Sequence, residues 1–150
     1  MPPSTPTTGP LAYLGAATAS IRRQTRRPAL ANRPYFDAVH AHLVALHFLL
    51  DRLTEDGDPS NPATGSHLTA ARTRIWQATS HLHDAYHSAP HLDGTPAMRG
   101  DCLSEQVLEG PLFLTICQRH LVTTITVRRQ TTPADLASPP LHGHTTYFNI

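Results

Sequence analysis

Apolar residues between positions 33 and 55 recur at alternating three- and four-residue steps, which is the spacing of one helix face. This seam consists of Phe36, Val39, Leu43, Leu46, Leu50 and Leu53. Asn32 is a typical N-cap residue and Pro34 suits a first helical turn, so both mark where the helix begins. The polar turn at residues 56–59 ends it. We therefore expect a core-packed helix whose central leucines, Leu43, Leu46 and Leu50, are buried.

Two further segments carry the same helical spacing. The first begins near Ser66 and ends before Pro90, with a seam of Leu68, Ala71, Ile75, Ala78, Leu82 and Ala85. The second covers residues 112–130, and its seam is Phe113, Ile116, Cys117, His120, Thr124 and Val127. Residues 122–127 are all β-branched, which favours a strand, so residues 121–128 are open to either interpretation. We favour a helix, because the sequence offers no second strand to pair with it.

The ends of the chain have few residues to bury. Residues 1–10 are rich in Pro and Thr, and residues 131–150 are polar with three further Pro, so we expect both ends to be disordered. Residues 11–27 can form a short amphipathic helix that Pro28 ends. The prediction is an all-α protein, an up-and-down bundle of three long helices plus a shorter N-terminal one. Its parts are a basic arm (1–32), the bundle (33–130) and a C-terminal tail (131–150).

Composition excludes two broad classes of protein. The chain has 150 residues, of which 39% are apolar, and no apolar run is long enough to span a membrane. Two Cys are too few for a disulfide scaffold. Residues 11–20 have the length of a signal-peptide core. A signal peptide requires a basic residue before that core, and none precedes residue 11. We expect a cytoplasmic protein with no membrane partner.

Basic charge is concentrated in one place. All twelve basic residues are Arg, and five lie among the first 36 residues, where there is no acidic residue. The candidate phosphate contacts are Arg22, Arg23, Arg26, Arg27, Arg128 and Arg129. No aromatic residues interleave them, and no helix-turn-helix pattern follows. Nucleic-acid binding through the basic arm is therefore one alternative function.

Eleven His make the charge of the chain depend on pH, because the formal net charge of +1 assumes that every His is neutral. His83 and His87 are spaced i, i+4 and can ligate one metal ion from a single helix face. His40 and His47 could complete the site if the helices pack in register. This pattern loosely resembles the three-His metal site of DinB-type four-helix bundles, which makes a Zn- or Ni-dependent bundle enzyme the second alternative.

The simpler interpretation of these imidazoles is that they flank apolar seams. Burial would then lower the pKa of His40, His47 and His120, and the bundle would lose stability below about pH 6.5. Cys117 and His120 are spaced i, i+3, but Cys117 is predicted to lie well inside its helix on the apolar face. We expect a buried, inert thiol there, no catalytic residue elsewhere and no required cofactor.

Three segments together resemble a family of small actinobacterial proteins known only as a domain of unknown function. They are residues 35–53, residues 71–87 and residues 115–136, the last including Cys117-Gln118-Arg119-His120. The resemblance implies no reaction, cofactor or functional residue. The function that we favour from the sequence is a non-catalytic module that binds a protein partner or a second copy of itself.

Overall fold

The computed structural model describes residues 10–27, 31–98, 102, 115–130 and 133, and all regular structure in this part of the chain is helical. The helices are α1 (Pro10–Gln24), α2 (Arg33–Glu55), α3 (Pro62–Ser88) and α4 (Ile116–Gln130). The all-α prediction is confirmed, and residues 121–128 are helix and not strand. Most of the predicted disordered ends, and Phe113, lie outside the described residues. None of the described helices has the length and apolar character needed to cross a bilayer.

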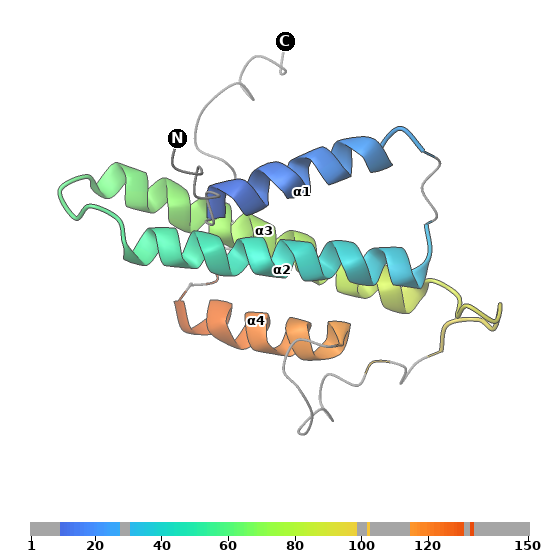
Figure 1. The fold of residues 1–150 in the computed structure, drawn as a ribbon. Coiled ribbons are helices and arrows are strands. Elements are labelled where there is room, and N and C mark those ends of the chain that lie inside the picture. The colour runs from blue at the N-terminus through green and yellow to red at the C-terminus, as the bar shows by residue number, and fades with distance from the viewer. Residues whose placement is uncertain (1–9, 28–30, 99–101, 103–114, 131–132, 134–150) are drawn as a thin grey trace, which may run out of the picture. The chain divides into compact units, whose positions relative to one another are not determined.

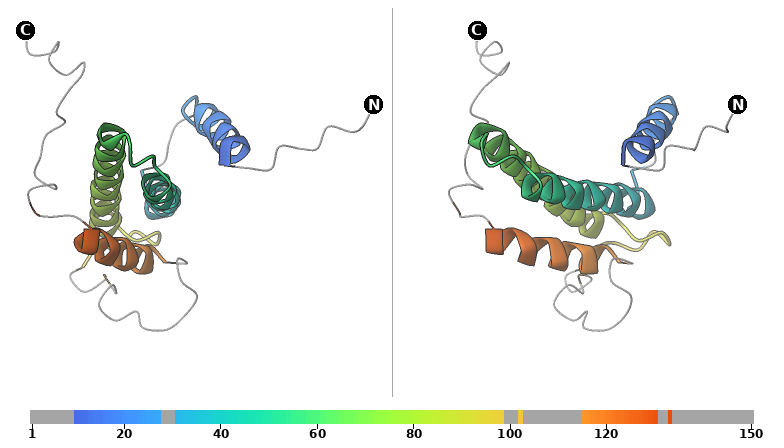
Figure 2. Two further views of the ribbon diagram at one scale, coloured as in Figure 1. Left: turned by 90° about the vertical axis from the view of Figure 1, so that its left-hand side faces the viewer. Right: turned by 60° about the vertical axis from the view of Figure 1, so that its left-hand side comes forward.

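The chain divides into two compact units, Met1–Ala31 and Asn32–Ile150. The first contains α1, whose Leu11, Tyr13 and Ile21 side chains are exposed. In the second, α2 and α3 lie side by side and run in opposite directions, and α4 packs against both (Figure 1). The pairing of α2 with α3 is much more extensive than the packing of α4 on either helix. The second unit is therefore a helical hairpin that carries a third helix, as the further views also show (Figure 2).

Local sequence signals account for where α2, α3 and α4 begin. The side chain of Asn32 accepts a hydrogen bond from the backbone N–H of Tyr35, as predicted for an N-cap. Asn61 caps α3 in the same way and Pro62 is its first residue, so α3 begins four residues earlier than the predicted Ser66. At α4 the Thr115 hydroxyl accepts from the N–H of Gln118, whose side chain accepts from the N–H of Thr115. This capping box sets the start of α4 at Ile116.

The most buried face of α2 is not the predicted leucine seam. His40 and His47 are fully buried and Val44 is 3% exposed, whereas Leu43, Leu46 and Leu50 are only half-buried. The prediction of a buried leucine seam was therefore wrong, because the buried face of α2 is rotated by about one residue from the face that carries the leucines. The reason is that α3 and α4 offer polar partners to the His face. Arg119 donates to Nδ1 of His40, and Nδ1 of His47 lies 3.3 Å from the carbonyl oxygen of Arg72.

The interior of this unit is unusually polar. Thr79 and Thr123 are fully buried, and each hydroxyl donates to a backbone carbonyl of its own helix, so neither loses a hydrogen bond on burial. Two buried guanidinium groups are paired with carboxylates, Arg72 with Asp51 at 2.6 Å and Arg119 with Asp37. These ion pairs join α2 to α3 and α2 to α4, respectively. Polar pairs thus carry much of the helix packing that apolar seams were predicted to supply.

Candidate metal centre

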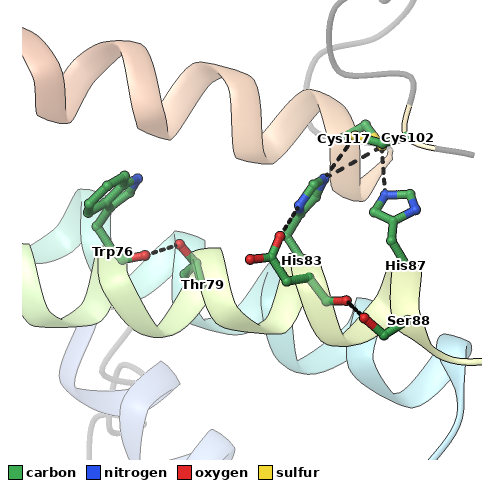
Figure 3. A network of polar contacts seen from close by, with 8 residues as sticks. Trp76, Thr79, His83, His87, Ser88, Cys102 and Cys117 are labelled. Atoms are coloured by element: carbon green, nitrogen blue, oxygen red, sulfur yellow. Dashed lines mark hydrogen bonds and ion pairs between the residues drawn. The ribbon is translucent and has the colours of Figure 1, made fainter. Parts of the chain in front are cut away.

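Four side chains that ligate soft metals converge where α3 ends and α4 begins. His83 and His87 come from the last two turns of α3, Cys117 from the first turn of α4, and Cys102 from the segment between them. One potential ligand atom of each lies within 4.8 Å of the others. Figure 3 shows the two imidazoles pointing from α3 toward the two sulfurs. The four side chains together are called the His₂Cys₂ cluster below.

Helical geometry brings the two imidazoles together. A spacing of i, i+4 places side chains on the same helix face one turn apart, and the rings of His83 and His87 have centroids 4.6 Å apart. Both Nε2 atoms approach sulfur: His87 Nε2 lies 3.2 Å from Cys117 Sγ, and His83 Nε2 lies 3.4 Å from Cys102 Sγ. Since the capping box begins α4 at Ile116, Cys117 stands in the first turn.

The distances in the cluster are close to those of a tetrahedral zinc site, with every pair of ligand atoms within 4.8 Å. With Zn–S near ~2.3 Å and Zn–N near ~2.0–2.1 Å, tetrahedral geometry separates the ligand atoms by roughly 3.3–3.8 Å. The two sulfurs lie 3.9 Å apart and are not disulfide-bonded. Three sulfur–nitrogen distances are 3.2, 3.4 and 3.9 Å. Two thiols and two imidazoles form a ligand set typical of Zn²⁺, and their spacing leaves room for one ion.

The groups around His83 hold its ring in the orientation that metal binding needs. Nδ1 of His83 lies 3.3 Å from a carboxylate oxygen of Asp84, so the ring donates its Nδ1–H there and its Nε2 lone pair faces the sulfurs. The His120 ring stacks on His83 with centroids 3.9 Å apart. Burial lowers the pKa of His83, although the hydrogen bond to Asp84 acts in the opposite direction. A neutral imidazole with a free Nε2 lone pair is the form that binds a metal.

The structure brings together half of the metal ligands that the sequence suggested. His83 and His87 meet as their spacing predicts, but His40 and His47 lie outside the cluster, so no three-His site of the DinB type forms among the described residues. His40 faces Arg119, and His47 faces the backbone of Arg72. Burial is the largest cause that lowers the pKa of His40 to about 3, of His120 to about 4, and of His47 below its usual value. The predicted direction of these pKa shifts is confirmed.

The sequence-based prediction did not include either sulfur of the cluster. Cys117 is buried, as predicted, but it lies in the first turn of α4 and not well inside the helix. Its sulfur contacts His87 and His83 of α3, which the spacing of Cys117 and His120 did not predict. Cys102, which is exposed to solvent, had no role in the sequence-based prediction. The available signals were a His pair at i, i+4 followed by both Cys of the chain, and the Thr-x-x-Gln capping box.

The basic residues remain candidates for phosphate contacts. Arg22 and Arg23 lie in the last turn of α1, Arg26 and Arg27 follow that helix, and all four are exposed. Arg128 and Arg129 are exposed in the last turn of α4, which belongs to the other unit. Nucleic-acid binding through these residues stays a prediction.

The comparisons with known proteins show a family relationship and no activity. No curated protein and no solved structure shows significant similarity to the chain. One family model matches residues 1–147, which is nearly the whole sequence. That match confirms the predicted relationship to a domain of unknown function and assigns no activity. The chain belongs to the family of unknown function DUF6238.

Proposed function

We propose that this protein is a non-catalytic helical module in which one Zn²⁺ ion, bound by the His₂Cys₂ cluster, holds α4 against the α2–α3 hairpin. The observation that carries the proposal is the convergence of His83, His87, Cys102 and Cys117, whose ligand atoms all lie within 4.8 Å of one another. Because four protein side chains complete the coordination sphere of a tetrahedral zinc ion, no coordination position is left for a substrate or a reactive water molecule. The proposal therefore favours a structural ion over a catalytic one.

The pairing of α4 with its neighbours, which is less extensive than that of α2 with α3, explains what a structural ion would contribute. Unlike α2 and α3, which pair along much of their length, α4 makes limited contact with either helix. Its contacts with α2 include those of Arg119 with Asp37 and of Gln130 with Asp51. A metal bound by two side chains of α3 and one of α4 would fix the first turn of α4 to the hairpin. Binding free energy at such a site adds directly to the free energy of folding.

The test is a metal titration of the untagged protein. The metal-free protein, kept reduced, should bind one Zn²⁺ per chain and gain thermal stability as it does so. Substitution with Co²⁺ should produce the visible absorption of a tetrahedral site together with thiolate-to-metal charge transfer. Cys117→Ser and His83→Gln should each weaken binding strongly. His81→Gln, which changes an exposed His on the same helix, is the matched control and should bind as the wild type does.

Two results would overturn the proposal. One is the absence of stoichiometric zinc binding in the reduced wild-type protein. The other is a six-coordinate cobalt spectrum without charge transfer, which would place the ion away from the sulfurs. Far-ultraviolet circular dichroism of each variant separates lost ligation from lost folding, since a folded variant keeps its helical signal.

A further inference from the structure

We propose that peroxide converts Cys102 and Cys117 into a disulfide, which releases the zinc ion and so removes the metal link between α3 and α4. This inference rests on the zinc site proposed above. Three observations support it: the separation of the two sulfurs, the access that solvent has to one of them, and the different segments that the ion and the disulfide would join.

The two sulfurs are close enough to bond after a small movement. Their separation is 3.9 Å, and a disulfide bond is ~2.05 Å long, so closure requires a shift of roughly 2 Å. Zinc would keep both sulfurs as thiolates, which is the form that reacts with peroxide. Cys102 is more exposed to solvent than Cys117, which is buried, so an oxidant in solution reaches Cys102 first. Cys117 then stands beside it as the resolving thiol.

The chemistry balances with a peroxide as the only oxidant. The Cys102 thiolate attacks one oxygen of hydrogen peroxide, the O–O bond breaks, and the hydroxide that leaves takes a proton and becomes water. The Cys117 thiolate then attacks the sulfur of the resulting sulfenic acid and displaces a second hydroxide, which is also protonated to water. Two thiolates, one peroxide and two protons thus yield one disulfide and two water molecules. The zinc ion loses both anionic ligands and keeps only two neutral imidazoles.

The disulfide does not replace the attachment that the ion supplies. Zinc would link α3, through His83 and His87, to the first turn of α4, through Cys117. The disulfide links Cys117 only to Cys102, which lies outside α3, so the metal link between α3 and α4 is lost and the stacking of His120 on His83 remains as their contact at the cluster. The contacts of Arg119 with Asp37 and of Gln130 with Asp51 lead to α2 and do not depend on the ion. Oxidation should therefore loosen α4 while the α2–α3 hairpin stays paired.

The experiment treats the zinc-loaded protein with hydrogen peroxide and follows metal, thiols and backbone exchange together. A chromogenic chelator should report the release of one zinc ion per chain. Mass spectrometry of proteolytic fragments should find an intramolecular Cys102–Cys117 disulfide, and a thiol reductant with added zinc should reverse both changes. Amide hydrogen exchange in α4 should become roughly tenfold faster or more, with much smaller changes in α2 and α3. His81→Gln is the control and should respond as the wild type does.

The outcomes separate this inference from the zinc site itself. Zinc that stays bound while peroxide is consumed, thiols that end as sulfinic acid, or disulfides between chains would each overturn the switch and leave the zinc site standing. Unchanged exchange in α4 after the disulfide has formed would overturn the release of that helix. A reduced protein that binds no zinc would overturn the zinc site, and this inference with it. Cys102→Ser should form no intramolecular disulfide under the same treatment.

Discussion

Nε2 of His87 lies 3.2 Å from the sulfur of Cys117, although the two residues are 30 positions apart in the chain. This contact connects the last turn of α3 with the first turn of α4. Both positions are defined by local helix signals, since a Pro follows the end of α3 closely and a capping box begins α4. The ends of the helices thus determine where along the chain the two side chains lie. Whether the two side chains come into contact depends on how the helices pack.

Asp84 should matter for metal affinity although it is not a ligand. Its carboxylate accepts the Nδ1–H of His83 and so keeps Nε2 free to bind an ion. Asp84→Asn should weaken zinc binding by about 10- to 100-fold, measured by competition with a chromophoric chelator. Glu55→Gln changes an exposed acidic residue of α2 and serves as the control. Equal affinities for the two variants would show that Asp84 does not orient the ring.

Burial of His40 should make the bundle sensitive to acid. Its folded pKa is lowered to about 3, chiefly by burial and then by Arg119 of α4, with His83 and His120 adding to the effect. The unfolded chain therefore binds the proton first, near pH 6.5. Stability should be complete above pH 6.5 and fall as the pH drops toward 3, by up to about 1.4 kcal/mol per pH unit from this residue.

Chemical denaturation of metal-free protein between pH 7.5 and 5 measures the effect. His40→Gln should show a shallower loss of stability than the wild type, because its unfolded state no longer gains that proton. His67→Gln, an exposed position on α3, should keep the wild-type slope. If the slope of His40→Gln equals that of the wild type, another group is responsible for the acid sensitivity.

The buried ion pair between Arg72 and Asp51 should contribute more to the free energy of unfolding than the exposed pair of Arg52 and Glu55 on α2. The side chains of Arg72 and Asp51 are 7% and 17% exposed and 2.6 Å apart, whereas those of Arg52 and Glu55 are mostly exposed. Asp51→Ala should cost about 3–5 kcal/mol, because it leaves a buried guanidinium without its carboxylate. Glu55→Ala should cost less than about 1 kcal/mol. Urea denaturation of both variants at neutral pH tests the difference.

Two positions on α4 provide a test of packing within one helix. Val127 is 1% exposed and Ile125 is 42% exposed. Val127→Ala should lower the free energy of unfolding by about 1–3 kcal/mol, since it removes two methyl groups from a packed interior. Ile125→Ala should change it by less than about 1 kcal/mol, even though it deletes more atoms. Thermal unfolding would contradict this packing if the larger loss came from Ile125→Ala.

Local signals in the sequence were sufficient to predict helices. The three- and four-residue spacing between residues 33 and 55 and the N-cap at Asn32 both correspond to observed features of α2. The spacing of His83 and His87 likewise predicts that they share a face of α3, as they do. Such features depend on residues within one or two turns, so they can be derived from the chain alone.

The tertiary structure decided which face of each helix is buried and which residues meet. The leucine seam of α2 is half-buried, because α3 and α4 pack on the His40 and His47 face, where Arg119 and the backbone of Arg72 each contact one ring nitrogen. Cys102 and Cys117 join the His pair only because α4 folds back against α3. The strength of a buried polar pair depends on its partner and on the exclusion of water. The partner and the exclusion of water are both properties of the assembled helices, and they cannot be derived from the hydrophobic spacing along the sequence.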